Sequence, residues 1–178
     1  ADRNYSSTMD YDLDIDASGN AVVAYRQSVA GGDGIIATSV SPAGMIRWNQ
    51  TVQTGGTFVA SPVICSVGPS VFVGWISDND SKFQQLNTLG SPQWKTPTLI
   101  SDPAGGYFLV SDMHPSLDES VIIAGVQYLT FSGTKTLKAQ RINNNGTVAW
   151  LNQVAVMENN SLQFGNFPDF LNGYVNFA

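Results

Sequence analysis

Four aspartates near the start of the sequence, at alternate positions from Asp10 to Asp16, are spaced for joint chemistry. In an extended strand alternate side chains point to the same face, so their carboxylates would stand side by side. Like charges this close favour a bound cation or full solvation. The candidate metal ligands are Asp12, Asp14 and Asp16, and the candidate ion is Ca²⁺.

The segment matches only the first half of a calcium-binding loop. Oxygen donors stand at Asp14, Asp16 and Ser18, and a glycine follows at Gly19. The twelfth position is Tyr25, where such a loop needs a bidentate glutamate. We therefore favour the interpretation that the aspartates lie on a solvated or channel-facing strand, and we expect no obligatory cofactor.

No set of residues has the spacing of a catalytic site. The only histidine, His114, lies near Asp112 and Asp118, but the sequence has no Gly-x-Ser-x-Gly elbow for a Ser-His-Asp triad. The two glutamates, Glu119 and Glu158, fall in predicted turns, so the carboxylate pair of a glycoside hydrolase is not assigned. The sequence predicts a protein that is not an enzyme.

Composition excludes several classes of partner. The net charge of -6 and the isoelectric point near 4.4 argue against nucleic-acid or anionic-membrane surfaces, which need clustered Lys and Arg. No apolar run approaches the roughly 18 residues of a membrane span, so no membrane insertion is expected. The single cysteine, Cys65, excludes an internal disulfide and is predicted to be a core residue.

A Gly-x-x-x-Trp motif occurs three times, each time after a run of alternating apolar and polar residues. The copies are Gly44 to Trp48, Gly90 to Trp94 and Gly146 to Trp150. Tryptophan faces can stack on sugars, but recurrence at one place in a repeat favours packing between sheets. The motif divides the chain into units of about 50 residues: 10–56, 57–106, 107–160 and a partial unit at 161–178.

One strand of each unit fixes the register. The segments VVAY, FVGW and IIAG place a small residue at 24, 74 and 124, spaced by 50 residues. A small residue in a near-continuous apolar strand suggests close approach by a neighbouring sheet. No segment shows helical periodicity, so the predicted fold class is all-β. Four antiparallel strands per unit predict β-propeller blades.

The chain resembles the repetitive β-propeller segments of secreted or surface-displayed bacterial proteins of the Bacteroidetes type. The resemblance rests on Ala139 to Ile142 followed by Gly146 and Trp150, and on Ser61 to Ile64 leading to Val73-Gly74-Trp75. It implies a secreted or cell-surface location and a binding or scaffolding role. The first unit departs from it with ATSV in place of the AQR form, and Gly125 replaces the aromatic residue found at 25 and 75.

The chain carries three and a half predicted blades, an incomplete ring, whereas closed propellers have at least four. An open arc exposes apolar faces, so we expect complementary blades from the same parent protein or from another chain. Pairing of two identical chains is less favoured at this stage, because it leaves two half-blades unless they join.

Ligands of propellers are expected at the loops of one rim. The second-to-third-strand loops and the connections between units share a rim, and a glycan or a basic peptide would suit acidic groups beside aromatic ones. The candidates are Asp33, Asp78, Asp80, Asp102, Tyr107 and Phe131. We expect a non-enzymatic extracellular module that binds protein or glycan; the alternatives are an accessory propeller of a secreted hydrolase and a structural spacer.

Overall fold

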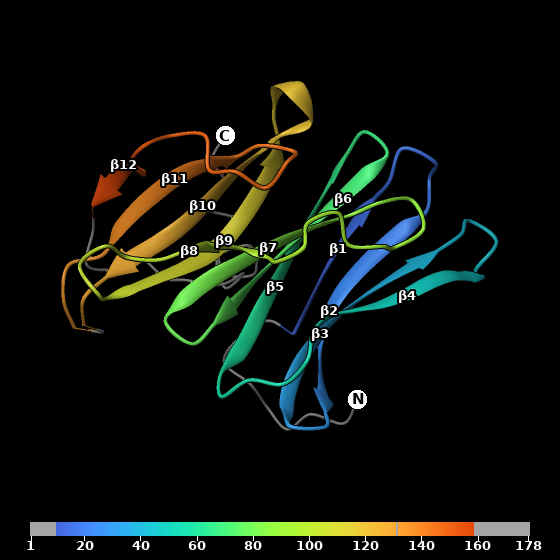
Figure 1. Ribbon diagram of the computed structural model, residues 1–178, viewed down its shortest axis with the longest axis horizontal. Helices are drawn as coiled ribbons and strands as arrows, with labels where there is room; N and C mark the ends of the chain where they lie inside the picture. The colour runs from blue at the N-terminus through green and yellow to red at the C-terminus, as the bar shows by residue number, and fades with distance from the viewer. Residues whose placement is uncertain (1–9, 131, 159–178) are drawn as a thin grey trace.

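The computed structural model describes residues 10–130 and 132–158, which form three four-stranded antiparallel sheets in chain order (Figure 1). The predicted partial unit at 161–178 lies outside the described residues. In every sheet the strands follow one another as a meander, each paired with the next. No helix in the described part of the chain is long and apolar enough to cross a membrane.

The strands begin and end as follows. The first sheet contains β1 (Tyr11–Ile15), β2 (Ala21–Val29), β3 (Gly32–Val40) and β4 (Ile46–Gln53). The second contains β5 (Val59–Val67), β6 (Ser70–Ser77), β7 (Asp80–Leu86) and β8 (Thr98–Ile100). The third contains β9 (Tyr107–Pro115), β10 (Val121–Tyr128), β11 (Thr136–Ile142) and β12 (Val154–Glu158), with the 3₁₀ turn η1 (Leu117–Glu119) between β9 and β10.

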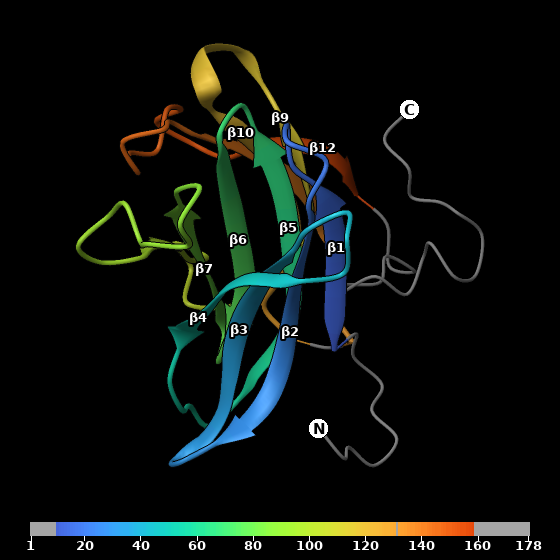
Figure 2. The same ribbon diagram turned by 90° about the vertical axis from the view of Figure 1, so that its right-hand side faces the viewer.

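The three sheets stack as an arc with the second sheet in the middle. The first strand of each sheet contacts the first strand of the next, β1 against β5 and β5 against β9. Figure 2 shows β1 and β5 on the same side of their sheets, with β4 and β7 on the other. Four-stranded meanders stacked through their faces, with first strands together, are propeller blades. The predicted fold class is therefore confirmed for the described residues.

The core consists of two apolar layers between neighbouring sheets. One layer joins the first and second sheets around Trp75, and the other joins the second and third around Phe72, Phe83 and Phe108. All four of these aromatic side chains are fully buried. Strand β6 is buried on both faces, whereas β2 alternates between buried and half-buried residues. The first sheet thus has a neighbour on only one face among the described residues.

Gly74, the small residue at the centre of β6, has a different cause from the one expected, and Gly125 beside Ala124 is crowded in a similar way. A Cβ added at Gly74 would lie 2.8 Å from the ring of Phe83 and 2.9 Å from Val63, and one at Gly125 would lie 2.6 Å from Phe108. These crowding side chains come from adjacent strands of the same sheet, not from a neighbouring sheet. At 125 the ring of Phe108 fills the space where the other units place an aromatic residue of β2 or β6.

The Gly-x-x-x-Trp motif joins each sheet to the next. A Cβ on Gly90 would lie 2.7 Å from the indole of Trp48, and one on Gly146 would lie 2.8 Å from the indole of Trp94. The indole N–H of Trp48 donates to the Thr88 carbonyl at 3.1 Å, and that of Trp94 donates to the Asn144 carbonyl at 2.8 Å. The predicted packing role of the motif is confirmed: the tryptophan of one unit covers the glycine turn of the next.

Buried glutamines explain the residues that precede the motif. The Gln84 amide donates to the Trp94 carbonyl at 3.0 Å and accepts the Trp94 N–H at 3.2 Å. Gln140 holds Trp150 in the same way, at 3.1 and 3.2 Å. The first unit has Thr38 at this position, so Trp48 is held without such an amide.

The role of the indole-covered turns is tested by replacing Gly90 with alanine. Both Gly90 and Gly105 have a φ of 79°, but nothing lies within 4 Å of a Cβ on Gly105. We expect Gly105→Ala to lower the free energy of unfolding by about 1–2 kcal/mol through backbone strain alone. Gly90→Ala should cost about 1–3 kcal/mol more, because the methyl group displaces the Trp48 indole. Equal losses in urea unfolding would contradict the contact.

Candidate functional site

Two aspartates of β1 connect the first strands of neighbouring sheets. The Asp12 carboxylate accepts the Leu13 N–H at 2.8 Å on one oxygen and the Ile64 N–H of β5 at 2.9 Å on the other. Asp14 accepts the Ile15 N–H and the Ser66 N–H, both at 2.7 Å. The β5 edge that carries no paired strand is therefore bound by carboxylates.

Strand β9 carries an aspartate at the same position as β1, but no inner strand of a further sheet lies beside it in the described residues. Asp12 pairs with Ala24 and Asp112 with Ala124, so the two aspartates occupy equivalent register positions. Asp112 accepts the Met113 N–H at 2.8 Å, as Asp12 accepts that of Leu13. Its second oxygen lies 3.0 Å from Nε2 of His114. The alternating pattern that signals Asp12 and Asp14 in the sequence thus recurs at 112 and 114 with a histidine.

The pKa values of Asp12 and Asp16 are shifted in opposite directions. Burial raises the pKa of Asp12 to about 6. Hydrogen bonds from Ile64 and Leu13 lower this pKa, and the negative charges of Asp112 and Asp14 raise it further. Burial alone would also raise the pKa of Asp16, but hydrogen bonds from Asn20 and Ser18 outweigh it and hold that pKa below its usual value. Asp12 therefore binds a proton more readily than an ordinary aspartate does, and Asp16 binds one less readily.

The three candidate calcium ligands do not converge on one point. Asp12 and Asp14 bind the backbone of β5, whereas Asp16 accepts N–H groups of Ser18 and Asn20 and so closes the turn between β1 and β2. No group of three or more His, Cys, Asp or Glu side chains in 10–130 and 132–158 is placed to hold a metal ion. These contacts give the three aspartates a structural role.

The rim candidates lie in separate places: Asp78 and Asp102 lie between strands, whereas Asp33, Asp80 and Tyr107 lie at the beginnings of β3, β7 and β9. Asp33 lies 4.0 Å from the guanidinium of buried Arg26 in the first sheet. Asp78 accepts the Phe58 N–H at 3.3 Å, and Asp80 begins β7, both in the second sheet. The contact of Asp78 with Phe58 joins the β6–β7 loop to the connection between the first and second sheets.

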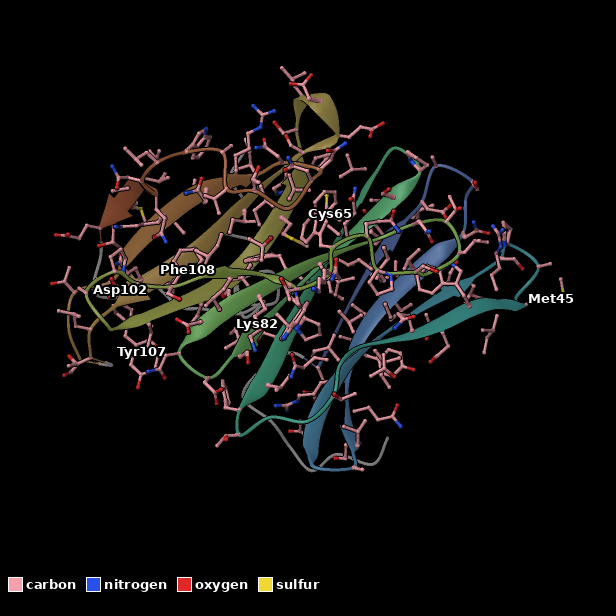
Figure 3. The ribbon with its side chains drawn as sticks, in the orientation of Figure 1. Met45, Cys65, Lys82, Asp102, Tyr107 and Phe108 are labelled. Carbon is pink, nitrogen blue, oxygen red and sulfur yellow. The ribbon has the colours of Figure 1, made fainter. Side chains whose placement is uncertain are left out.

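Asp102 and Tyr107 flank the glycine turn before β9, and Figure 3 shows them at one end of the molecule. The buried Asp102 carboxylate accepts the N–H groups of Ala104 and Gly106 and the amide of Gln127. Tyr107 stacks on Tyr128 with ring centroids 4.8 Å apart. Both side chains therefore serve the connection between the second and third sheets. Phe131 lies outside the described residues.

Two hollows along the seam between the second and third sheets were not anticipated from the sequence. The larger, of about 510 Å³, is lined by residues 93–98 and 145–147, which include Trp94 and Lys95. The smaller, of about 270 Å³, is lined by Leu99, Ile100, Ser101, Pro103, Lys138, Gln140, Val148, Leu151, Asn152 and Gln153. We call them the seam hollows. No acidic side chain lines either one, and two of the eight basic residues do.

The seam hollows are lined by β8 and the segments on either side of it, and by β11 and the connection from β11 to β12. Trp94 packs edge-to-face on Phe72, with ring centroids 5.7 Å apart, and its indole N–H binds the third sheet. Gln153 donates to the Ser101 carbonyl at 3.1 Å, which joins the two walls of the smaller hollow. Amides, hydroxyls and an ammonium group beside apolar side chains are the groups that proteins place around polar ligands.

Comparison with known proteins identifies no family. No family model matches the sequence, and no curated protein matches it. A solved structure that matches is described as a GH43 glycoside hydrolase engineered to display both endo-xylanase and exo-arabinofuranosidase activity. The sequences are 13% identical, the TM-score is 0.49, and the alignment covers 78% of this chain. The chain spans 27% of that protein's length, and the blade assignment above rests on the three sheets themselves.

The raised pKa of Asp12 predicts how stability depends on pH. A carboxyl group whose pKa rises from 3.8 unfolded to about 6 folded binds its proton more tightly in the folded state. Its stabilising effect is complete below about pH 4 and is lost as the pH rises through 6. Between pH 7 and pH 4 the wild type should gain up to about 3 kcal/mol of unfolding free energy that Asp12→Asn does not gain. Parallel pH profiles for the two proteins would contradict this assignment.

Cys65 is expected to be unreactive in the folded protein. Burial raises the pKa of its thiol to about 12, and the charges of Asp14, Asp112 and Asp12 add to the rise. Because the thiolate is the reactive form, a disulfide reagent should label almost no Cys65 in native buffer and one thiol per chain in denaturant. Fast labelling of the native protein would show that the inner strands open.

Proposed function

We propose that this chain is a non-enzymatic, secreted or surface-displayed β-propeller module that binds a glycan at the seam hollows. The observation that carries the proposal is the lining of these hollows. In a protein of net charge -6 they contain no carboxylate and two lysines, together with amides, hydroxyls and apolar walls. Such a lining suits neutral sugars and, through the lysines, sugars that carry a carboxylate.

The contacts of Asp12 and Asp14 support a role without turnover. Both oxygens of Asp12 and of Asp14 accept backbone N–H groups, so they stabilise the contact between sheets. A general acid or base needs a free oxygen within reach of the substrate. The secreted or surface location belongs to the same proposal and is supported by the resemblance of the repeat motifs.

One observation favours a second candidate, an accessory part of a secreted hydrolase. Asp112 lies on the inner strand β9, near enough to Asp12 to raise its pKa, and its second oxygen contacts the exposed ring of His114. Additional blades could complete a carboxylate site around it. This candidate predicts turnover of a chromogenic glycoside that is lost in Asp112→Asn.

The binding proposal is tested by calorimetry with neutral oligosaccharides, uronic-acid oligosaccharides and a basic peptide. We expect binding of oligosaccharides and about tenfold weaker binding of the uronic-acid series to Lys138→Gln, because one charge-assisted hydrogen bond is lost. Lys82→Gln is the matched control, since Lys82 lies in β7 and lines neither hollow. Binding of the peptide alone, or equal effects of both variants, would overturn the seam site.

A further inference from the structure

Two parts of the motif, the glycine turn of the first sheet and the tryptophan of the third sheet, have no partner of this kind in the described residues. Gly44 has the same φ of 79° as Gly90, and its N–H donates to the Ser41 carbonyl at 2.8 Å, as that of Gly90 does to Asn87 at 2.9 Å. A Cβ on Gly44 would meet nothing within 4 Å. The turn at Gly44 therefore has the shape of an occupied turn and lacks its indole.

The complementary half is Trp150. Gln140 holds its backbone as Gln84 holds that of Trp94, so Trp150 has the same place on the third sheet that Trp94 has on the second. Figure 1 shows the third sheet and the β3–β4 turn at opposite ends of the molecule, and Figure 3 places Met45 at the tip of that turn. Trp150 therefore does not cover Gly44 of the same chain. The remaining tryptophan, Trp75, is fully buried.

The open face of the first sheet carries the apolar residues that such a contact requires. By register, Leu13 and Val23 match Ile64 and Val73, which are buried between the first and second sheets. Leu13 and its neighbours on this face of β1 are exposed: the exposed fractions are 60% for Tyr11, 53% for Leu13 and 52% for Ile15. A contiguous apolar surface of this kind marks a protein interface.

The inner strands supply a third match. Asp12 of β1 binds the N–H of Ile64 in the next sheet, and Asp112 occupies the same register position on β9. The equivalent of Ile64 on the first sheet is Leu13, whose side chain lies on the open face and whose N–H donates to Asp12, so the match is one of strand position. A first sheet placed beyond the third sheet would bring β1 alongside Asp112, as β5 lies alongside Asp12.

We propose that the open face of the first sheet binds the third sheet of a second copy of this chain, head to tail, with Trp150 of each copy covering Gly44 of the other. The indole N–H would donate to the carbonyl of Pro42, which holds the place of Thr88 and Asn144 two residues before the glycine. One molecule carries both halves of the contact at opposite ends, so two copies satisfy both halves at once. This pairing is independent of glycan binding.

The pairing is tested by light scattering and sedimentation velocity of the whole chain at micromolar concentrations. The expected particle has twice the mass of one 19.1 kDa chain. Trp150→Ala and Gly44→Ala should each raise the dissociation constant at least about tenfold, as loss of a central aromatic anchor does. Gly105→Ala, which has the same φ and no neighbour, should leave it unchanged. Circular dichroism and thermal unfolding verify that the variants fold.

Mixing provides the decisive result. Each variant alone forms pairs with no intact contact, whereas a mixture of Trp150→Ala with Gly44→Ala retains one Trp150–Gly44 contact per pair. The mixture should therefore associate more tightly than either variant. A single-chain particle at every concentration, or association that neither variant weakens, would overturn the proposal. A purified parent protein in which further blades of the same polypeptide cover Gly44 would overturn it as well.

Discussion

An indole that lies flat against a glycine turn is the contact on which the stacking of this protein depends. The turn needs glycine for two reasons at once: its φ is near 80°, and the ring leaves no room for a Cβ. Trp48 and Trp94 each reach from one sheet to the next through this contact and add a hydrogen bond to a turn carbonyl. It fixes how far apart the outer strands of neighbouring sheets lie.

The inner strands are held by a different chemistry. Asp12 and Asp14 bind the β5 edge, and the hydroxyl of Ser81 bridges to β9 by donating to the Phe108 carbonyl and accepting the Val110 N–H. Polar side chains thus bind the inner strands β5 and β9, and tryptophan side chains join the outer parts of neighbouring sheets. The apolar layers between the sheets fill the space that these two sets of contacts define.

The sequence predicted the fold well because the signals for it are local. Alternating runs, glycine turns and the 50-residue spacing of the second strands all depend on neighbours within one sheet. The cause of the small residue at 74 was predicted wrongly, since crowding by Phe83 and Val63 depends on which side chains face each other across strands. Spacing alone does not show that.

The sites were harder to predict because they form between units. The alternating aspartates predicted the strand correctly, but not their bond to β5, whose partner residues lie 52 positions away. The seam hollows combine 93–103 with 138–153, and none of their residues has an unusual type. Their distinguishing property, a lack of carboxylates in an acidic protein, appears only when the two walls are brought together.

The glycine and the tryptophan of the motif lie four residues apart, although each contacts a different neighbour. Each unit of about 50 residues therefore carries both the glycine turn that the indole of the preceding unit covers and the indole that covers the turn of the next unit. Duplication or deletion of one such segment leaves every remaining junction intact, because the new neighbour presents the same turn. The number of blades in relatives of this protein can thus change in evolution without compensating substitutions at the seams.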